Sequence, residues 1–199
     1  MIQGDVAFDS DTHRYEHIPT GTPLVSVTSV IKAIGKGTDY SAADPAAVEF
    51  ARIRGKAVDD YLSEYLVMGR VTIRPDETLD VIRRFEIGRQ VIDDMGCSHI
   101  DVQPIRYSVE DGIAGTIDFI FDRKLACDLK NMRDPSPVAW RLQLGAAIDY
   151  GHLERGMILQ IAPRVYRDTG FRIFTYDGQE CRDAWREAVY LWKHLADHE

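Results

Sequence analysis

Two carboxylates and one lysine stand close together in the middle of the chain, in segments that are otherwise apolar. Asp118 interrupts the apolar run 112–121, and Asp128 and Lys130 interrupt the run 125–131. The polar residues 122–124 between the two runs are few enough to form a hairpin turn. With that turn, residue 121 pairs with residue 125, and Asp118 falls directly opposite Asp128.

This pairing has a chemical consequence. The Cβ atoms of cross-strand partners are only about 5 Å apart, so two carboxylates placed there repel each other. An uncompensated pair inside an apolar sheet is costly, and a bound cation would remove the cost. Lys130 lies two residues after Asp128, so the strand period of two puts both on one face. The pattern predicts a site for a divalent metal ion and a phosphate; the alternative for an isolated Asp-x-Lys is a surface strand with a salt bridge.

Two further polar residues lie on predicted helices. Gln143 is flanked by Leu142 and Leu144, and its side chain could orient Lys130 or a phosphate oxygen. The alternative is a half-buried glutamine that is hydrogen-bonded to the backbone. Asp59 precedes the buried edge of its helix, and the residues alone favour solvent exposure for it.

The elements that would carry these side chains alternate between helices and strands. Apolar spacing and capping residues predict helices over 26–35, 44–69, 76–95, 138–153 and 179–196. Strands are predicted over 100–107, 112–121, 125–131, 156–167 and 171–176. This order predicts an α/β fold with a mixed β-sheet and helices on both faces. The 199 residues fit a single domain, 1–199, in which an N-terminal hairpin and helix, 1–43, form an elaboration.

Composition narrows the function classes. The net charge of −8 argues against a protein that coats nucleic acid through a broad basic surface, although a local phosphate track is compatible with it. No apolar run approaches the roughly 20 residues that span a bilayer, so no membrane association is expected. The start of the chain lacks the pattern of a signal peptide. Three widely spaced cysteines, 97, 127 and 181, indicate a reducing compartment, and we expect a cytoplasmic protein.

Several segments together resemble the PD-(D/E)XK nuclease superfamily, specifically its RecB-like and lambda-exonuclease-like phage branch. The opening FDSDTHRYEHIPTGTPLVSVTSVI and the helical RGKAVDDYL are similar to that branch. The segments GIAGTIDFIF and ACDLKN match its two acidic strand motifs, and WRLQLGAAIDY resembles its glutamine-bearing helix. The resemblance covers nearly the whole chain and implies a restriction-endonuclease-like core.

The resemblance also implies roles for individual residues. Asp118 and Asp128 would bind Mg²⁺ or Mn²⁺ together with the backbone carbonyl of Leu129, while Lys130 would be the catalytic lysine and Gln143 the motif glutamine. Asp59 falls where the branch usually has histidine, and a carboxylate there also suits a hard cation. Candidate phosphate contacts beside the motifs, each with a solvated surface residue as its alternative, are Arg54, Asn131, Arg133 and Arg141.

The implied activity is metal-dependent hydrolysis of DNA phosphodiester bonds. We expect an exonuclease that acts on double-stranded DNA ends in phage-type recombination or repair, in the host cytoplasm if the chain is phage-encoded. One alternative is a structure-specific or single-strand endonuclease on the same core. Another, motivated by Asp59, is a non-catalytic DNA-binding or recombination accessory protein. Besides DNA, the resemblance implies further copies of the chain in a homo-oligomer and a single-strand annealing protein as partners.

Overall fold

The computed structural model describes residues 2–9, 12, 14–38, 41–132 and 136–195. In these residues one sheet has five strands in the order β11–β10–β9–β8–β5. Its two parallel neighbours are β9 (Leu125–Lys130) and β10 (Arg155–Ile161), and its other pairs are antiparallel. The remaining strands are β5 (Ile100–Val102), β8 (Phe119–Phe121) and β11 (Phe171–Asp177).

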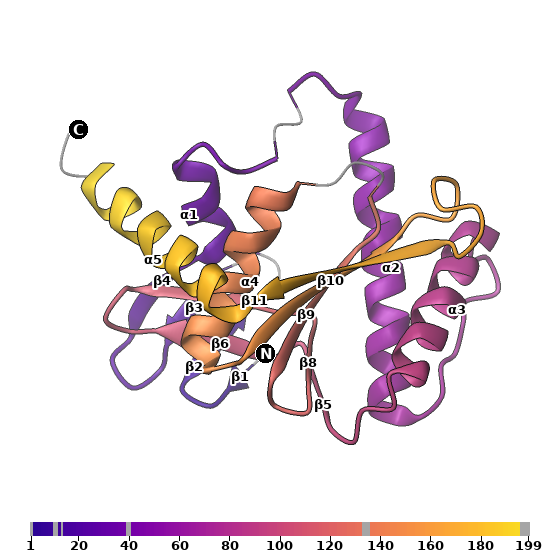
Figure 1. Ribbon diagram of the computed structural model, residues 1–199, viewed down its shortest axis with the longest axis horizontal. Coiled ribbons are helices and arrows are strands. Elements are labelled where there is room, and N and C mark those ends of the chain that lie inside the picture. The colour runs from indigo at the N-terminus through magenta and orange to yellow at the C-terminus, as the bar shows by residue number, and fades with distance from the viewer. Residues whose placement is uncertain (1, 10–11, 13, 39–40, 133–135, 196–199) are drawn as a thin grey trace.

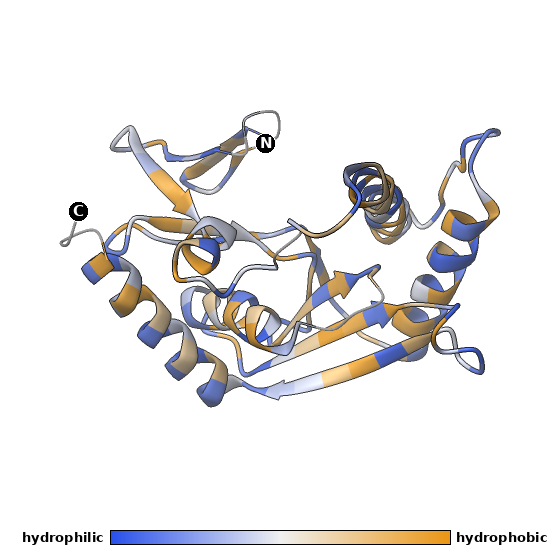
Figure 2. Ribbon diagram, turned by 90° about the horizontal axis from the view of Figure 1, so that it is seen from above, coloured by the Kyte–Doolittle hydropathy of each residue, from blue (hydrophilic) through white to orange (hydrophobic). Residues whose placement is uncertain are grey.

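Helices cover both faces of this sheet (Figure 1). One face packs on α2 (Pro45–Met68) and α3 (Leu79–Asp94) through alternate strand residues, which include Phe119, Phe121 and Cys127. The other face packs on α4 (Pro137–Gly151) through the residues between them, such as Ile120 and Ala126. Figure 2 shows the long apolar stretches that these strands carry. The predicted mixed sheet with helices on both faces is confirmed.

A second sheet of six strands, again within the described residues, has the order β1–β2–β3–β4–β7–β6. Its strands are β1 (Ile2–Gln3), β2 (Val6–Asp9), β3 (Arg14–His17), β4 (Thr22–Ser26), β6 (Ile105–Ser108) and β7 (Ile113–Thr116). Beside it, α1 (Val27–Ala33) and α5 (Gly178–Leu195) share a hydrophobic cluster with α4. The predicted N-terminal hairpin corresponds to β2 and β3, whose register pairs Phe8 with Tyr15.

The two sheets are joined where two of the predicted strands are each divided in two. The predicted strand 100–107 is divided into β5 and β6, and the predicted strand 112–121 into β7 and β8. Gln103 has a positive φ of 49°, and Pro104 has no N–H to donate, so the ladder breaks there. The ribbon stays paired across the break, because the Gln103 N–H donates to the Asp118 carbonyl over 2.8 Å. We call this the ribbon bend; Asp118 lies in it.

Helix boundaries follow from local capping. The side chain of Asp44 accepts a hydrogen bond from the Ala46 N–H, and Gly69 ends α2 in the left-handed conformation, so the helix predicted over 44–69 runs without a break. The helix predicted from residue 76 begins later, because Thr78 is its N-cap. The strand predicted over 156–167 ends at residue 161, where the Ala162 carbonyl accepts turn hydrogen bonds. In the described ranges, no helix has the length and apolar character needed to cross a membrane.

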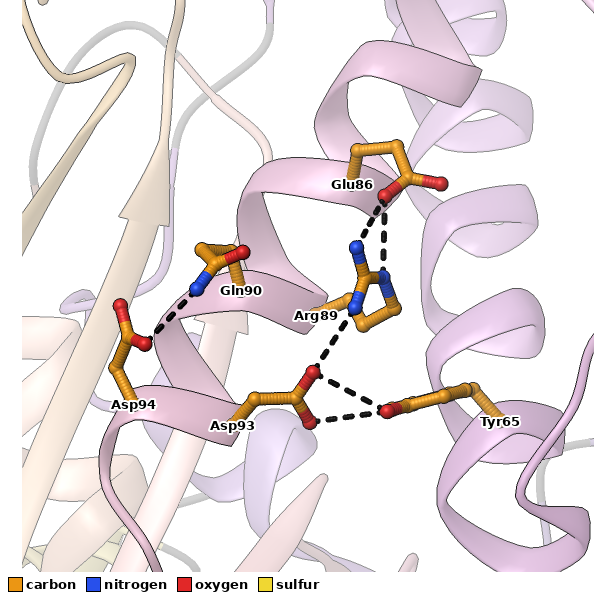
Figure 3. Close-up of polar contacts among 6 residues, drawn as sticks. All are labelled: Tyr65, Glu86, Arg89, Gln90, Asp93 and Asp94. Carbon is orange, nitrogen blue, oxygen red and sulfur yellow. Dashed lines mark hydrogen bonds and ion pairs between the residues drawn. The ribbon is translucent and has the colours of Figure 1, made fainter.

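Surface side chains hold α3 against α2. The Tyr65 hydroxyl of α2 donates to both carboxylate oxygens of Asp93 over 3.1 Å (Figure 3). Arg89 also donates to Asp93, over 3.0 Å, and to Glu86, over 2.8 Å. These contacts supplement the apolar packing of α3 against α2, the helix that carries Asp59.

Candidate active site

The β8–β9 hairpin has the predicted register. Phe121 pairs with Leu125 and Phe119 with Cys127, and continuing by one residue puts Asp118 opposite Asp128. The turn is possible because Asp122 and Arg123 both adopt positive φ, of 49° and 59°. Asp122 also accepts hydrogen bonds from Ser98 and His99, so its side chain ties the turn to the start of β5.

Asp128, Lys130 and Gln143 form a closed ring of polar contacts on the α4 side of the sheet. Lys130 forms an ion pair with one carboxylate oxygen of Asp128. Gln143 of α4 donates to the other oxygen over 3.0 Å and accepts a hydrogen bond from Lys130 over 3.0 Å. Asp128 is only 2% exposed, so these partners replace the water that it loses. The structure therefore places Gln143 where it orients Lys130, rather than bonded to the backbone.

Asp118 has a different environment from Asp128. Its carboxylate accepts a hydrogen bond of 2.6 Å from the Leu129 N–H. Burial, followed by the negative charge of Asp128, raises the pKa of Asp118 to about 7. Burial alone would lower the pKa of Lys130, but the charges of Asp128 and Asp118 outweigh it and hold that pKa above its usual value. Lys130 is therefore a cation at neutral pH.

Asp59 turns inward from α2 and joins the other two carboxylates. Its Oδ1 atom is buried and has no hydrogen-bond partner among the residues that the structure describes. Burial, followed by the charges of Asp118 and Asp128, raises the pKa of Asp59 well above its usual value. The expectation of solvent exposure for Asp59 is wrong, because the turn of α2 that carries it faces the ribbon bend rather than water.

The donor set fits a hard divalent cation. Within the described residues, no three His, Cys, Asp or Glu side chains are arranged to hold a metal ion by themselves. Mg²⁺ seldom needs such a cage, since it commonly binds one or two carboxylates and completes its shell with water and substrate phosphate. The unpartnered oxygen of Asp59 and the raised pKa of Asp118 both indicate too little positive charge among these carboxylates. Mg²⁺ or Mn²⁺ would supply it.

The candidate phosphate contacts do not form one group. Arg54 of α2 donates to the Asn131 carbonyl over 3.1 Å, so these two lie together beside the end of β9. Arg141 is exposed on α4. Burial raises the pKa values of Tyr176 and Cys181, and the charge of Arg141 opposes that rise, which places Arg141 toward β11 and α5. Arg133 lies outside the described residues.

An open groove of about 1440 Å³ gives access to the carboxylates. Asp59, Asp118 and Gln143 line it, together with residues of α1, the first half of α2, β7 and α4. Lys56 and Arg106 also line the groove and were not identified from the sequence. Lys56 belongs to the quoted segment RGKAVDDYL, so the sequence could have identified it. Arg106 reaches the groove through the ribbon bend, which the sequence did not predict.

No protein-family model and no curated protein matches the chain. Among solved structures it is similar to the alkaline exonuclease LHK-Exo from Laribacter hongkongensis, with 8% identity, coverage of 88% of this chain and 90% of that chain, and a TM-score of 0.45. The complex of LHK-Exo with dAMP gives 10% identity, coverage of 88% of both chains and the same TM-score, 0.45. A phage related exonuclease from Haemophilus somnus 129PT gives 15% identity, coverage of 91% and 99%, and a TM-score of 0.43. At this level of similarity, the function is inferred from the chain's own side chains.

Proposed function

We propose that the chain is a metal-dependent deoxyribonuclease of the PD-(D/E)XK type that hydrolyses phosphodiester bonds at double-stranded DNA ends. One observation carries the proposal: Asp118, Asp128, Lys130 and Asp59 lie together beside an open groove that Asp118, Asp59 and Gln143 line, and Gln143 orients Asp128 and Lys130. Buried carboxylates beside a buried lysine are costly for a purely structural site. They suit a site where a cation and a phosphate bind together.

Asp118 and Asp128 would hold the Mg²⁺ or Mn²⁺ ion, with the Leu129 carbonyl and Asp59 as further ligands. The bound ion would lower the pKa of a water nucleophile and stabilise charge on the phosphate oxygens. Lys130 is already protonated, so it donates to a phosphate oxygen or to the water and offsets negative charge in the transition state. Gln143 holds the Lys130 ammonium group in place for this role.

End-labelled linear duplex DNA provides the direct test. We expect cleavage with Mg²⁺ or Mn²⁺ and none with EDTA. Asp118→Asn and Lys130→Met should each lower the rate by roughly 100-fold or more, as removal of a group that stabilises the transition state does. Asp94→Asn is the matched control, because Asp94 is exposed at the end of α3 and is hydrogen-bonded only to Gln90 in the contacts of the described residues. Full activity of either site variant would overturn the assignment.

Covalently closed circular DNA separates the two nuclease activities. An exonuclease needs an end and leaves the circle intact, whereas an endonuclease on the same site opens it. Calorimetric titration with Mn²⁺ distinguishes a nuclease from a non-catalytic accessory protein. In an accessory protein that has lost the metal site, no Mn²⁺ binding depends on Asp118. Binding that Asp118→Asn abolishes, together with cleavage of linear DNA alone, is the result that we expect.

A further inference from the structure

A second charged cluster lies beside the candidate active site, between α2 and α3. Arg54 of α2 and Arg84 of α3 both contact the same oxygen of Asp80, at 3.5 Å and 3.1 Å. The Arg84 side chain is 6% exposed and the Arg54 side chain 19%. One carboxylate shared by two guanidinium groups leaves an excess of positive charge in a largely buried place.

The cluster also contains polar atoms without partners. Arg54 uses one terminal nitrogen for the Asn131 carbonyl, but its Nε atom is buried without an acceptor in the described part of the chain. The Oδ1 atom of Asn131 is likewise buried without a donor there. A buried donor without an acceptor costs about 1–3 kcal/mol, so it points to a missing partner.

Further positive charge comes from the loop after β10. Burial, followed by the charge of Arg84, lowers the pKa of Arg54; Asp80 opposes this shift and Arg164 adds to it. Arg164 is exposed. Three arginines against one aspartate form a local cationic site in a chain whose net charge is −8.

The position of the cluster connects it with the groove. β9 and β10 are parallel, and ligands of open α/β sheets bind outside the carboxyl ends of such strands. Asn131 directly follows Lys130 at the end of β9 and lines the groove. Arg84 donates to the carbonyl of Ile161, the last residue of β10. The cluster therefore lies where the two strands end, beside the residue that follows the candidate catalytic lysine.

We propose that Arg54, with the Arg84–Asp80 pair behind it, forms a second anion site that binds a backbone phosphate adjacent to the scissile one. This inference rests on the proposed nuclease function for its biological ligand. A guanidinium group presents its donors in a planar fork that matches two phosphate oxygens. The phosphate would accept from the exposed part of the Arg54 guanidinium group, in competition with Asp80, which limits the affinity so that the strand can leave.

The test uses inorganic phosphate as the probe, in EDTA and at constant ionic strength, with the thermal unfolding midpoint as the readout. Wild type should be stabilised by phosphate. Arg54→Gln should lose this response, and Asp80→Asn should reach the wild-type shift at roughly three- to tenfold less phosphate, because the competing carboxylate is gone. Arg83→Gln is the matched control, since Arg83 is the exposed neighbour of Arg84 on α3 and should respond like wild type.

A merely structural ion pair gives the opposite pattern. In that case Arg54→Gln keeps the phosphate response of wild type, or Asp80→Asn binds phosphate no more tightly than wild type does, and either result overturns the proposal. If Arg54→Gln does not fold, Arg54→Lys takes its place, because lysine keeps the charge but loses the fork and should weaken the response. The Asp80→Asn result is independent of both.

DNA binding tests the same site with its proposed ligand. By fluorescence anisotropy in EDTA, Arg54→Gln should reduce the salt dependence of duplex binding by about one phosphate contact, and Arg83→Gln should not. An unchanged slope for Arg54→Gln would contradict a phosphate contact. Neither experiment requires cleavage. If the chain binds phosphate at this site but is not a nuclease, both binding results are still seen and linear DNA is not cleaved. If the chain is a nuclease without this site, linear DNA is cleaved and Arg54→Gln behaves like wild type in both binding experiments.

Discussion

Burial favours the protonated form of Asp118, whereas the proposed metal binding needs its carboxylate. Its pKa of about 7 lies above its usual value of 3.8, so the folded protein binds a proton there that the unfolded chain has already released. A raised carboxyl pKa contributes stability below about pH 4 that is lost as the pH rises through about 7. The metal-free protein should therefore become less stable from pH 4 to pH 8.

Asp118→Asn should remove this pH dependence. Asparagine keeps an acceptor for the Leu129 N–H and carries no charge. At about 1.4 kcal/mol for each pKa unit, the free energy of unfolding at pH 8 should rise by up to about 4 kcal/mol, with little change at pH 4. Urea denaturation in EDTA at both pH values measures the difference, and Asp94→Asn should shift it by less than about 0.5 kcal/mol. Equal stability of Asp118→Asn and wild type at pH 8 would contradict the raised pKa.

Gln143 should act on turnover more than on substrate binding. Gln143→Leu removes the two hydrogen bonds that orient Lys130 and Asp128, while their ion pair remains. We expect kcat to fall by roughly 10- to 100-fold with KM within about threefold of wild type, because the loss is confined to the transition state. Gln90→Leu, which loses an exposed hydrogen bond on α3 (Figure 3), is the control. A change confined to KM would instead make Gln143 a contact for substrate.

At the scale of the elements, the close approach of α4 and α5 depends on Gly145. A Cβ atom there would lie 2.3 Å from the Cys181 carbonyl oxygen and 2.8 Å from the Trp185 Cβ. Gly145→Ala should therefore destabilise the protein by about 1–3 kcal/mol, as overpacking of a core does. Gly55→Ala is the opposite case: its nearest neighbour is the Asn131 Cβ at 3.9 Å, and alanine should stabilise α2 by about 0.5–1 kcal/mol. Chemical denaturation measures both changes in the free energy of unfolding: a decrease is expected for Gly145→Ala and an increase for Gly55→Ala.

The elements also show which parts of the fold are local enough to predict. The β8–β9 register followed from a three-residue turn between two apolar runs, and the start of α2 followed from Asp44 and Pro45. The ribbon bend was missed because apolar strand residues continue on both sides of Gln103 and Pro104, at Ile100 and Val102 before them and at Ile105 and Tyr107 after them. A positive φ at Gln103 is set by pairing with a distant strand rather than by residues beside it.

At the scale of the whole molecule, a bound metal should stabilise the fold. Anything that binds only the native state adds about 2.7 kcal/mol at 100 times its dissociation constant. Mn²⁺ should therefore raise the thermal unfolding midpoint of wild type, more strongly at pH 8 than at pH 5, because the cation competes with protons for the carboxylates. Asp118→Asn should lose most of this rise. An equal rise in that variant would place the ion elsewhere on the surface.

The candidate site as a whole could be predicted only in part. Asp118, Asp128 and Lys130 lie within 13 residues of one another, so strand geometry alone brought them together. A site role for Asp59 could be predicted only from the family resemblance, because a helical pattern does not show which of the adjacent Asp59 and Asp60 turns toward a distant sheet. The contact between Arg54 and Asn131 joins residues 77 positions apart and depends on how α2 packs across the end of β9.

The ribbon bend has a mechanical consequence. Asp118 belongs to a ribbon that is paired into both sheets, whereas Asp128 belongs to the five-stranded sheet alone. Any tilt of one sheet against the other must therefore alter the gap between these two acids. The groove is lined from both sides of the ribbon bend. A duplex bound in it would therefore push on the ribbon bend and change the distance between the Asp118 and Asp128 carboxylates that is available to the ion.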